Sequence, residues 1–237
     1  MAIRTSTIEI ATPDGSMPAH LAEPEGDGPH PAVVVLMEAF GLVSHIESVC
    51  DRLAAEGYVT VAPDIYYREL PDNKIGYDQL DDAIGLMQKL DDGRFVEDMR
   101  ATLDDLAARA NVNGERLGVT GFCMGGRLAF LSACALPDRI SAAAPFYGGG
   151  ITGHLDQAER IQAPLYLFFG DADTFIPREQ VDQIAARLRE LGTDYKLKNY
   201  PGAGHGFFCD QRVSHEPKAA EDAWSELRSF FAEHLRT

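Results

Sequence analysis

A cysteine between glycines is the first feature of this chain that could do chemistry. The segment reads Gly121-Phe122-Cys123-Met124-Gly125-Gly126 and lies between a predicted strand and a predicted helix. This is the G-x-S-x-G pattern of a nucleophile elbow, with sulfur in place of the hydroxyl. Glycine is needed on both sides because the sharp turn brings neighbouring backbone close. The start of the helix favours a thiolate, so we predict Cys123 as the nucleophile.

A nucleophile needs a base, and the base needs a group that orients it. Two later loops supply candidates, each directly after a predicted strand: Asp171 and Asp173 in the first, His205 in the second. The order Cys123, Asp173, His205 is the order of nucleophile, acid and histidine in α/β-hydrolases. We predict that Asp171 caps its own loop through backbone amides. Asp173 lies farther along the loop and is the predicted partner of the histidine.

The segment after the first buried strand offers an oxyanion hole and a carboxylate. The backbone N–H groups of Ala39 and Met124 are predicted to stabilise negative charge on an attacked carbonyl. Glu38 precedes Ala39, and a carboxylate buried there is costly unless it is paired or protonated. From the residues alone, Glu38 is either a solvated loop residue or part of the site.

Alternating strands and helices are expected to position these residues. Short apolar runs predict buried strands, and apolar positions at helical spacing predict the helices between them. Strands are predicted at 7–11, 18–22, 32–37, 58–62, 116–120, 140–145, 165–169 and 195–200. Helices are predicted at 45–56, 77–90, 95–110, 125–136, 178–191 and 217–235. The pattern indicates a single α/β domain over 1–237: a mostly parallel, doubly wound sheet with an antiparallel N-terminal hairpin. The two helices between 66 and 111 exceed one crossover, so we expect them to form a small helical lid.

Composition narrows the classes of partner. Among 237 residues, 37 acidic and 21 basic side chains give a net charge of −16, which disfavours nucleic acids and anionic membrane surfaces. The longest apolar run, 32–37, is far short of the roughly 18 residues that a membrane span needs. The first ten residues contain no signal-peptide pattern, so a cytoplasmic protein is expected.

The remaining cysteines and histidines suggest no metal site. The four cysteines include no C-x-x-C pair, and the histidines share no ligand spacing. Cys50 and Cys134 are predicted to pack in the core, and Cys209 has a structural or incidental role. Surface positions are expected for the other histidines, which are His20, His30, His45, His154, His215 and His234.

Several motifs together resemble the dienelactone hydrolase family, over a region from about Thr7 to the C-terminus. They are Glu38-x-Phe40-Gly41, Ala62-Pro63-Asp64-x-Tyr66, Gly121-Phe122-Cys123-x-Gly125-Gly126, Tyr147-Gly148, Gly170-x-x-Asp173 and Gly204-His205-Gly206-Phe207. The resemblance implies the α/β-hydrolase fold and a triad of Cys123, Asp173 and His205. It also implies that Glu38 contacts the resting thiol and that substrate displaces this contact. No metal or organic cofactor is implied.

In one respect the chain departs from the activity that defines the family. That activity opens an anionic dienelactone whose carboxylate is held by two arginines. At the corresponding positions this chain has the acidic segment 77–82 and Cys209. Arg68, Arg127 and Arg212 are candidates to compensate, although none lies at a matching position. The acidic segment is expected to disfavour an anionic substrate.

The predicted function is hydrolysis of small carboxylic esters or lactones through a covalent acyl-enzyme, without a cofactor, by a monomer or homodimer. Two alternatives remain: a broad carboxylesterase or thioesterase, and a catalytically silent fold that binds a small ligand. Predicted substrate-binding residues are Phe40, Tyr66, Arg127, Tyr147 and Phe207. Aromatic residues near strand ends are also common in ordinary cores.

Overall fold

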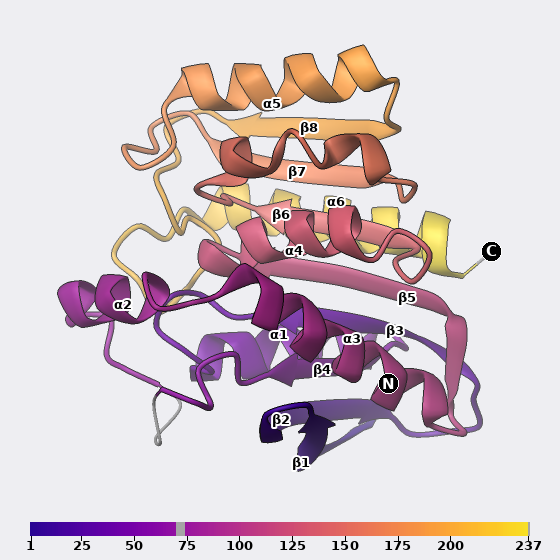
Figure 1. The fold of residues 1–237 in the computed structure, drawn as a ribbon. Helices are drawn as coiled ribbons and strands as arrows, with labels where there is room; N and C mark the ends of the chain where they lie inside the picture. The colour runs from indigo at the N-terminus through magenta and orange to yellow at the C-terminus, as the bar shows by residue number, and fades with distance from the viewer. Residues whose placement is uncertain (70–73, 237) are drawn as a thin grey trace.

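A single twisted sheet of eight strands runs through the protein, in a computed structural model that describes residues 1–69 and 74–236. The strand order is β1-β2-β4-β3-β5-β6-β7-β8 (Figure 1). The strands are β1 (Ile3–Thr12), β2 (Gly15–Pro24), β3 (His30–Leu36), β4 (Val59–Pro63), β5 (Val112–Phe122), β6 (Ala142–Phe146), β7 (Leu165–Gly170) and β8 (Tyr195–Tyr200).

Parallel pairing joins the six strands from β4 to β8, and the N-terminal hairpin completes the sheet. β1 and β2 pair antiparallel, and β2 continues antiparallel onto β4. Every residue of β4, β6 and β7 is buried, which explains why these strands appear as continuous apolar runs. The hairpin and the parallel sheet are as predicted from the sequence.

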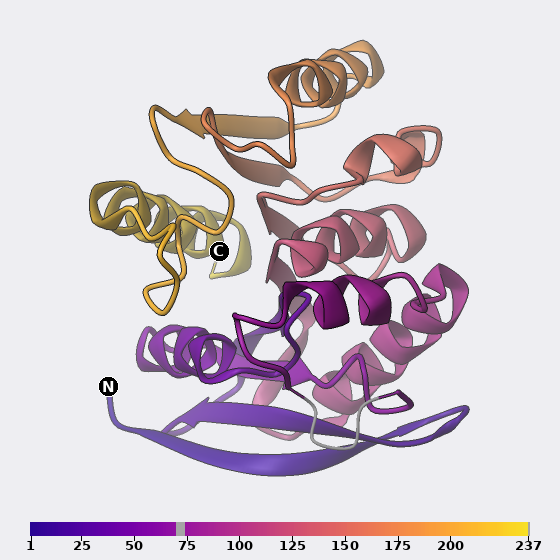
Figure 2. The ribbon, with the colours of Figure 1, turned by 90° about the vertical axis from the view of Figure 1, so that its left-hand side faces the viewer.

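Helices cover both faces of the sheet, as a doubly wound fold requires (Figure 2). In this view α1 and α6 lie on one side of the sheet, and α3, α4 and α5 lie on the other. Their bounds are α1 (Ser44–Ala55), α3 (Asp92–Ala108), α4 (Met124–Ala135), α5 (Arg178–Leu191) and α6 (Pro217–Leu235). The two layers bury the central strands between them, and the edge strands β1 and β8 are only partly covered.

The predicted lid is smaller than expected. The helix α3 packs against β5 and β1 and therefore belongs to the covering layer. Only the short helix α2 (Leu80–Met87) is left to project from the body of the protein (Figure 1). Ala83 is its one fully buried residue, and Leu86 and Met87 pack half-buried against the core, so α2 is held by a small apolar face. Two 3-10 turns that were not predicted, η1 (Ile151–His154) and η2 (Ala158–Arg160), lie between β6 and β7.

The carboxyl ends of the parallel strands meet at one edge of the sheet, where the candidate catalytic residues gather. The loops after β7 and β8 and the helix α2 lie at this edge, which faces the viewer in Figure 2. In open α/β sheets this is the edge where ligands bind. Among the described helices, none has the length and apolar character that crossing a membrane would require.

Candidate active site

The elbow predicted around Cys123 is present as a sharp strand-to-helix turn. Cys123 separates the end of β5 from the start of α4, with φ 55° and ψ −116°. Few non-glycine residues adopt a positive φ, and those that do often lie at functional sites. A Cβ on Gly121 would collide with the carbonyl oxygen of Gly125, and one on Gly125 would collide with that of Leu36. The glycines therefore let β5, α4 and the end of β3 approach closely enough to hold the strained turn.

Asp173 and His205 form the closest polar contact of the site. The Nδ1 atom of His205 lies 2.7 Å from Oδ2 of Asp173. The other carboxylate oxygen, Oδ1, accepts hydrogen bonds from the backbone N–H groups of Phe175 at 2.8 Å and Ile176 at 3.1 Å. These amides fix the carboxylate so that Oδ2 faces the imidazole. Asp171 accepts a hydrogen bond from the Gly202 N–H instead, so it ties two loops together.

The imidazole of His205 is held in an environment that favours its charged form. Burial lowers its pKa, but hydrogen bonds to Asp173 and Cys123 outweigh burial and raise the pKa to about 10. The ring thus contacts the carboxylate through Nδ1 and interacts with the thiol. A histidine so placed can hold a proton beside a thiolate.

Glu38 is completely buried and meets two polar groups from distant loops. Its Oε1 accepts a hydrogen bond from Nη1 of Arg212 at 3.2 Å, and its Oε2 accepts one from the Tyr77 hydroxyl at 3.2 Å. Among the described residues no hydrogen bond joins Glu38 to Cys123. Glu38 pairs with Arg212, whose charge compensates the buried carboxylate, and the contact with the resting thiol that the resemblance implied stays a prediction.

Backbone pairing brings Tyr77 to Glu38. Lys74 forms an isolated antiparallel bridge with Gly41, and the Ile75 N–H donates to the carbonyl of Phe40 at 2.9 Å. The Tyr77 ring then lies edge-on to Phe40, with centroids 4.8 Å apart. The segment before α2 is in this way attached to the loop after β3.

Arg212 contacts Glu38 from the loop after β8. Its guanidinium lies 5.3 Å from the ring centroid of Phe40 and 5.7 Å from that of Tyr77. Cation–π contacts of this kind add to the ion pair with Glu38. Tyr77 had no assigned role in the sequence. The sequence marked Arg212 only as a candidate to replace the arginines that the family uses. Its partner, Glu38, is seen only in the fold.

Two of the predicted pocket residues lie beside the elbow and the histidine. The Tyr66 hydroxyl donates to the sulfur of Met124 at 3.1 Å, directly after the nucleophile. Tyr147 lies edge-on to His205 at 5.2 Å and has a positive φ of 35°. Its hydroxyl is buried without a hydrogen-bond partner among the described residues, and burial raises its pKa well above the usual value.

Of the five predicted pocket residues, Phe40 contacts Tyr77 and Arg212, and the remaining two, Phe207 and Arg127, behave differently from Tyr66 and Tyr147. Phe207 is fully buried and packs edge-on against Tyr147 at 5.3 Å, so it holds the Tyr147 ring in place. Arg127 extends from α4 to Asp92, at 2.7 Å, and to Nε2 of His154, at 3.1 Å. Its guanidinium is therefore engaged by α3 and η1, and a role of Arg127 in substrate binding stays a prediction.

The oxyanion-hole residues flank the elbow. Met124 is the first residue of α4, so its N–H has no acceptor within that helix. Ala39 lies in the turn closed by the Gly41 N–H on the Glu38 carbonyl at 3.1 Å. This turn follows β3, whose last residues touch α4 at Gly125. The two amides thus lie on neighbouring segments beside Cys123.

Two histidines are more buried than the sequence suggested. His45 and His154 were expected at the surface, but both are buried, and His45 lies edge-on to Phe122 and Phe208. Cys209 is also buried, and burial is the main cause that raises its pKa to about 11. Donor atoms of His45, Cys209 and Asp210 lie within 4.8 Å of one another, so these side chains could hold a metal ion. Cys50 and Cys134 are buried, as predicted.

Comparison with known proteins gives a consistent result. The model of the dienelactone hydrolase family matches residues 17–235. A protein of Synechocystis sp. named "Putative carboxymethylenebutenolidase" is 37% identical over 99% of this chain and 98% of its own. A protein of the same name from Escherichia coli K12 is 36% identical over 98% of this chain and 88% of its own.

A solved structure agrees with these relatives over the whole chain. The crystal structure titled "Putative Dienelactone Hydrolase" from Klebsiella pneumoniae superposes with a TM-score of 0.89 at 32% identity, covering 98% of this chain and 100% of that one. Sequence, family model and fold therefore agree from the N-terminal hairpin to the last helix. This chain belongs to the dienelactone hydrolase family of α/β-hydrolases.

Proposed function

We propose that this protein hydrolyses small carboxylic esters or lactones through a covalent thioester on Cys123, without a cofactor. His205 acts as acid and base, and Asp173 orients its ring. The backbone N–H groups of Ala39 and Met124 form the oxyanion hole. Family membership supports hydrolase chemistry, and the geometry around the elbow supports these individual roles.

The proposed reaction proceeds in two halves. The Cys123 thiolate attacks the carbonyl carbon, and the oxyanion forms beside the two amides. The tetrahedral intermediate collapses, and His205 gives its proton to the leaving oxygen, which departs as an alcohol or remains attached as the opened lactone. A water molecule then loses a proton to His205 and attacks the thioester. Collapse of the second intermediate breaks the C–S bond and releases the acid and the Cys123 thiolate, and the proton taken from water stays on His205, which restores the thiolate–imidazolium pair.

One observation carries this proposal. The Nδ1 atom of His205 lies 2.7 Å from a carboxylate that backbone amides fix, and the Cys123 thiol on the strained elbow helps to raise the pKa of the imidazole. A buried cysteine that merely packs would need neither the positive φ nor the oriented histidine. The proposal of a silent ligand-binding fold explains neither feature.

Replacement of the nucleophile tests the proposal. Cys123→Ala should lower kcat/KM for phenyl acetate by about a thousandfold or more, because the covalent path is lost. Cys134→Ala, which removes a buried thiol from the same helix, is the matched control and should keep most activity. Activity should also survive dialysis against a chelator, which tests the absence of a metal requirement.

Trapping the intermediate separates this mechanism from a general-base route. In the wild type, mass spectrometry after a slowly deacylated ester should place the acyl group on the peptide that contains Cys123. Comparison of lactones with 4-nitrophenyl esters distinguishes a lactone hydrolase from a broad carboxylesterase. Full turnover by Cys123→Ala, or acylation at another residue, would overturn the assignment.

A further inference from the structure

An open cleft of about 550 Å³ adjoins the histidine side of the candidate site. Three loops line it: the segment before α2 with Tyr77, the loop after β7 with Phe175, and the loop after β8 with His205 and Val213. The loop after β8 also contributes Arg212, whose charge is paired with Glu38. The cleft is therefore reached from solvent and ends at the imidazole.

Two of its walls are apolar side chains that the fold leaves exposed. Phe175 is 59% exposed, and Val213 is fully exposed. Large apolar residues at the rim of a cleft, rather than scattered singly, mark surfaces that bind apolar groups. The hydrogen bond from residue 175 to Asp173 comes from its backbone N–H, so the Phe175 ring is available to the cleft and to His205.

The position of His205 decides which part of a substrate would enter the cleft. The imidazole lies between two aromatic rings: Tyr147 at 5.2 Å, which is fully buried, and Phe175 at 5.2 Å, which faces the cleft. Because the histidine must hand its proton to the leaving oxygen, the leaving group has to lie next to the imidazole. The side of Tyr147 is closed, so the leaving group extends along Phe175.

Charges at the cleft select against an ionised leaving group. Asp78 is exposed at its rim, and the one guanidinium in its lining is already held by Glu38. The protein as a whole carries a net charge of −16. A neutral ring avoids this repulsion and gains contact with Phe175 and Val213.

We propose that this cleft is a leaving-group subsite for neutral aromatic or bulky apolar alcohols, with Phe175 and Val213 as its specificity-determining walls. The inference rests on the proposed function, since it assumes that His205 protonates the leaving oxygen. It concerns the alcohol part of the ester, and the acyl group is expected to lie elsewhere, on the side of the elbow.

A substrate series separates the two parts of the ester. Phenyl acetate and 2-naphthyl acetate share the acyl group and have alcohols of similar acidity, whereas phenyl acetate and phenyl butyrate share the alcohol. In the double variant Phe175→Ser/Val213→Ser, the ratio of kcat/KM for naphthyl over phenyl acetate should fall about tenfold. The ratio for butyrate over acetate should stay within about twofold of the wild-type ratio. Serine at position 175 keeps the backbone N–H that binds Asp173.

Leu80→Ser is the matched control, because Leu80 is also exposed, at 41%, but lies outside the cleft. It should change neither ratio. An unchanged naphthyl preference in the double variant, or a change confined to the acyl series, would overturn the subsite.

Product binding tests the subsite independently of turnover. Titration calorimetry should show 2-naphthol binding to the wild type more tightly than phenol, with the difference lost in the double variant. If no ester is hydrolysed but this difference is present, the proposed function fails and the apolar subsite stands. If esters are hydrolysed and 2-naphthol has no preference that depends on Phe175 and Val213, the subsite fails and the proposed function stands.

Discussion

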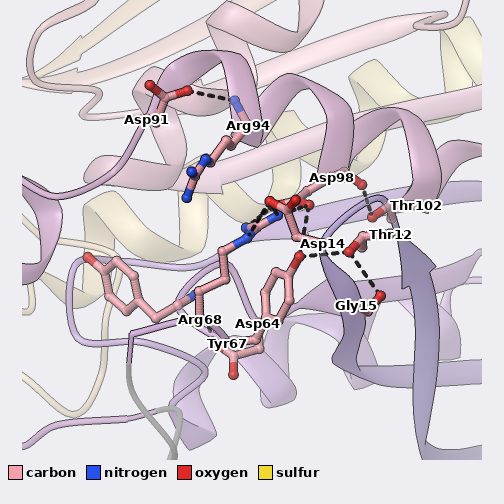
Figure 3. A network of polar contacts seen from close by, with 11 residues as sticks. Thr12, Asp14, Gly15, Asp64, Tyr67, Arg68, Asp91, Arg94, Asp98 and Thr102 are labelled. Carbon is pink, nitrogen blue, oxygen red and sulfur yellow. Dashed lines mark hydrogen bonds and ion pairs between the residues drawn. The ribbon is translucent and has the colours of Figure 1, made fainter.

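Two buried carboxylates of this protein each meet one arginine, but with different geometry. Arg68 contacts Asp98 through both terminal nitrogens of its guanidinium, Nη1 at 2.7 Å and Nη2 at 2.8 Å (Figure 3). Arg212 contacts Glu38 through Nη1 alone, at 3.2 Å. Short bidentate pairs are the stronger and more directional kind. The Arg68–Asp98 pair therefore has a fixed geometry, whereas the Arg212–Glu38 pair can rearrange more easily.

The surroundings of the two pairs reinforce the contrast. Arg68 also contacts Asp14 in the hairpin turn, and the Tyr67 hydroxyl donates to Asp98, so the network joins the hairpin, the loop after β4 and α3 (Figure 3). Glu38 and Arg212 instead lie on two loops, and Arg212 lines an open cleft. The comparison suggests that the first network serves stability and the second serves the site.

Removal of Arg68 should produce the largest loss of stability. Arg68→Ala leaves the buried carboxylate of Asp98 uncompensated, so the free energy of unfolding should fall by about 3–5 kcal/mol. Urea unfolding measures this loss. Arg68→Lys keeps the charge without the bidentate contact and should lie between the variant and the wild type. A loss of unfolding free energy below about 1 kcal/mol would show that solvent compensates the charge of Asp98 and that the network contributes little to stability.

Removal of Arg212 should act mainly on turnover. Its guanidinium balances the charge of Glu38 and interacts electrostatically with Cys123. Arg212→Ala should therefore lower kcat/KM for phenyl acetate about tenfold, or about 1.4 kcal/mol in activation free energy. Water from the cleft can reach the vacated position, so unfolding should change less than in Arg68→Ala. Equal loss of stability in the two variants, with unchanged activity for Arg212→Ala, would contradict the division of roles.

The smallest expected effect is a shift in the pH dependence of stability. The pKa of His205 is raised from 6.5 to about 10, so between these values the native state binds more protons than the unfolded state. This contribution is fully present below pH 6.5 and is lost as the pH rises through about 10. Cys123→Ser removes one of the groups that raise this pKa, so the loss should begin at lower pH.

Histidine NMR titration, with unfolding measured across the same pH range, checks this shift. Arg68→Ala should leave the His205 titration unchanged, because the network of Figure 3 does not reach the imidazole. If the pKa of His205 is the same in Cys123→Ser as in the wild type, the thiol does not contribute to that pKa.

The sequence predicted elements best where local chemistry marks their ends. The bounds of α5, β8 and α6 match the prediction, since Pro177 precedes α5, Gly192 ends it and Pro217 opens α6. The hairpin strands are ten residues each and extend beyond the predicted five. β1 is mostly exposed, so its ends carry no apolar signal. The helix α2 is shorter than predicted because Tyr77 turns toward Glu38.

For the candidate site, too, the sequence predicted best the residues that lie next to a recognisable local pattern. The elbow motif and the order of the loops identified Cys123, Asp173 and His205, because each follows a strand end that the fold brings to one edge. The pair of Glu38 and Arg212 joins residues 174 positions apart and depends on the path of an irregular loop. No periodicity records such a path, so this pair and the Tyr77 contact became visible only in three dimensions.

The loop after β7 divides two tasks between different atoms of the same residue. The backbone N–H of Phe175 helps to fix Asp173, whereas its side chain faces the cleft. Any amino acid except proline supplies that N–H. A change of the side chain at residue 175 therefore keeps the hydrogen bond to Asp173, although it removes a ring contact with His205 at 5.2 Å. Because the bond to Asp173 is retained, position 175 is a natural first site for engineering new selectivity.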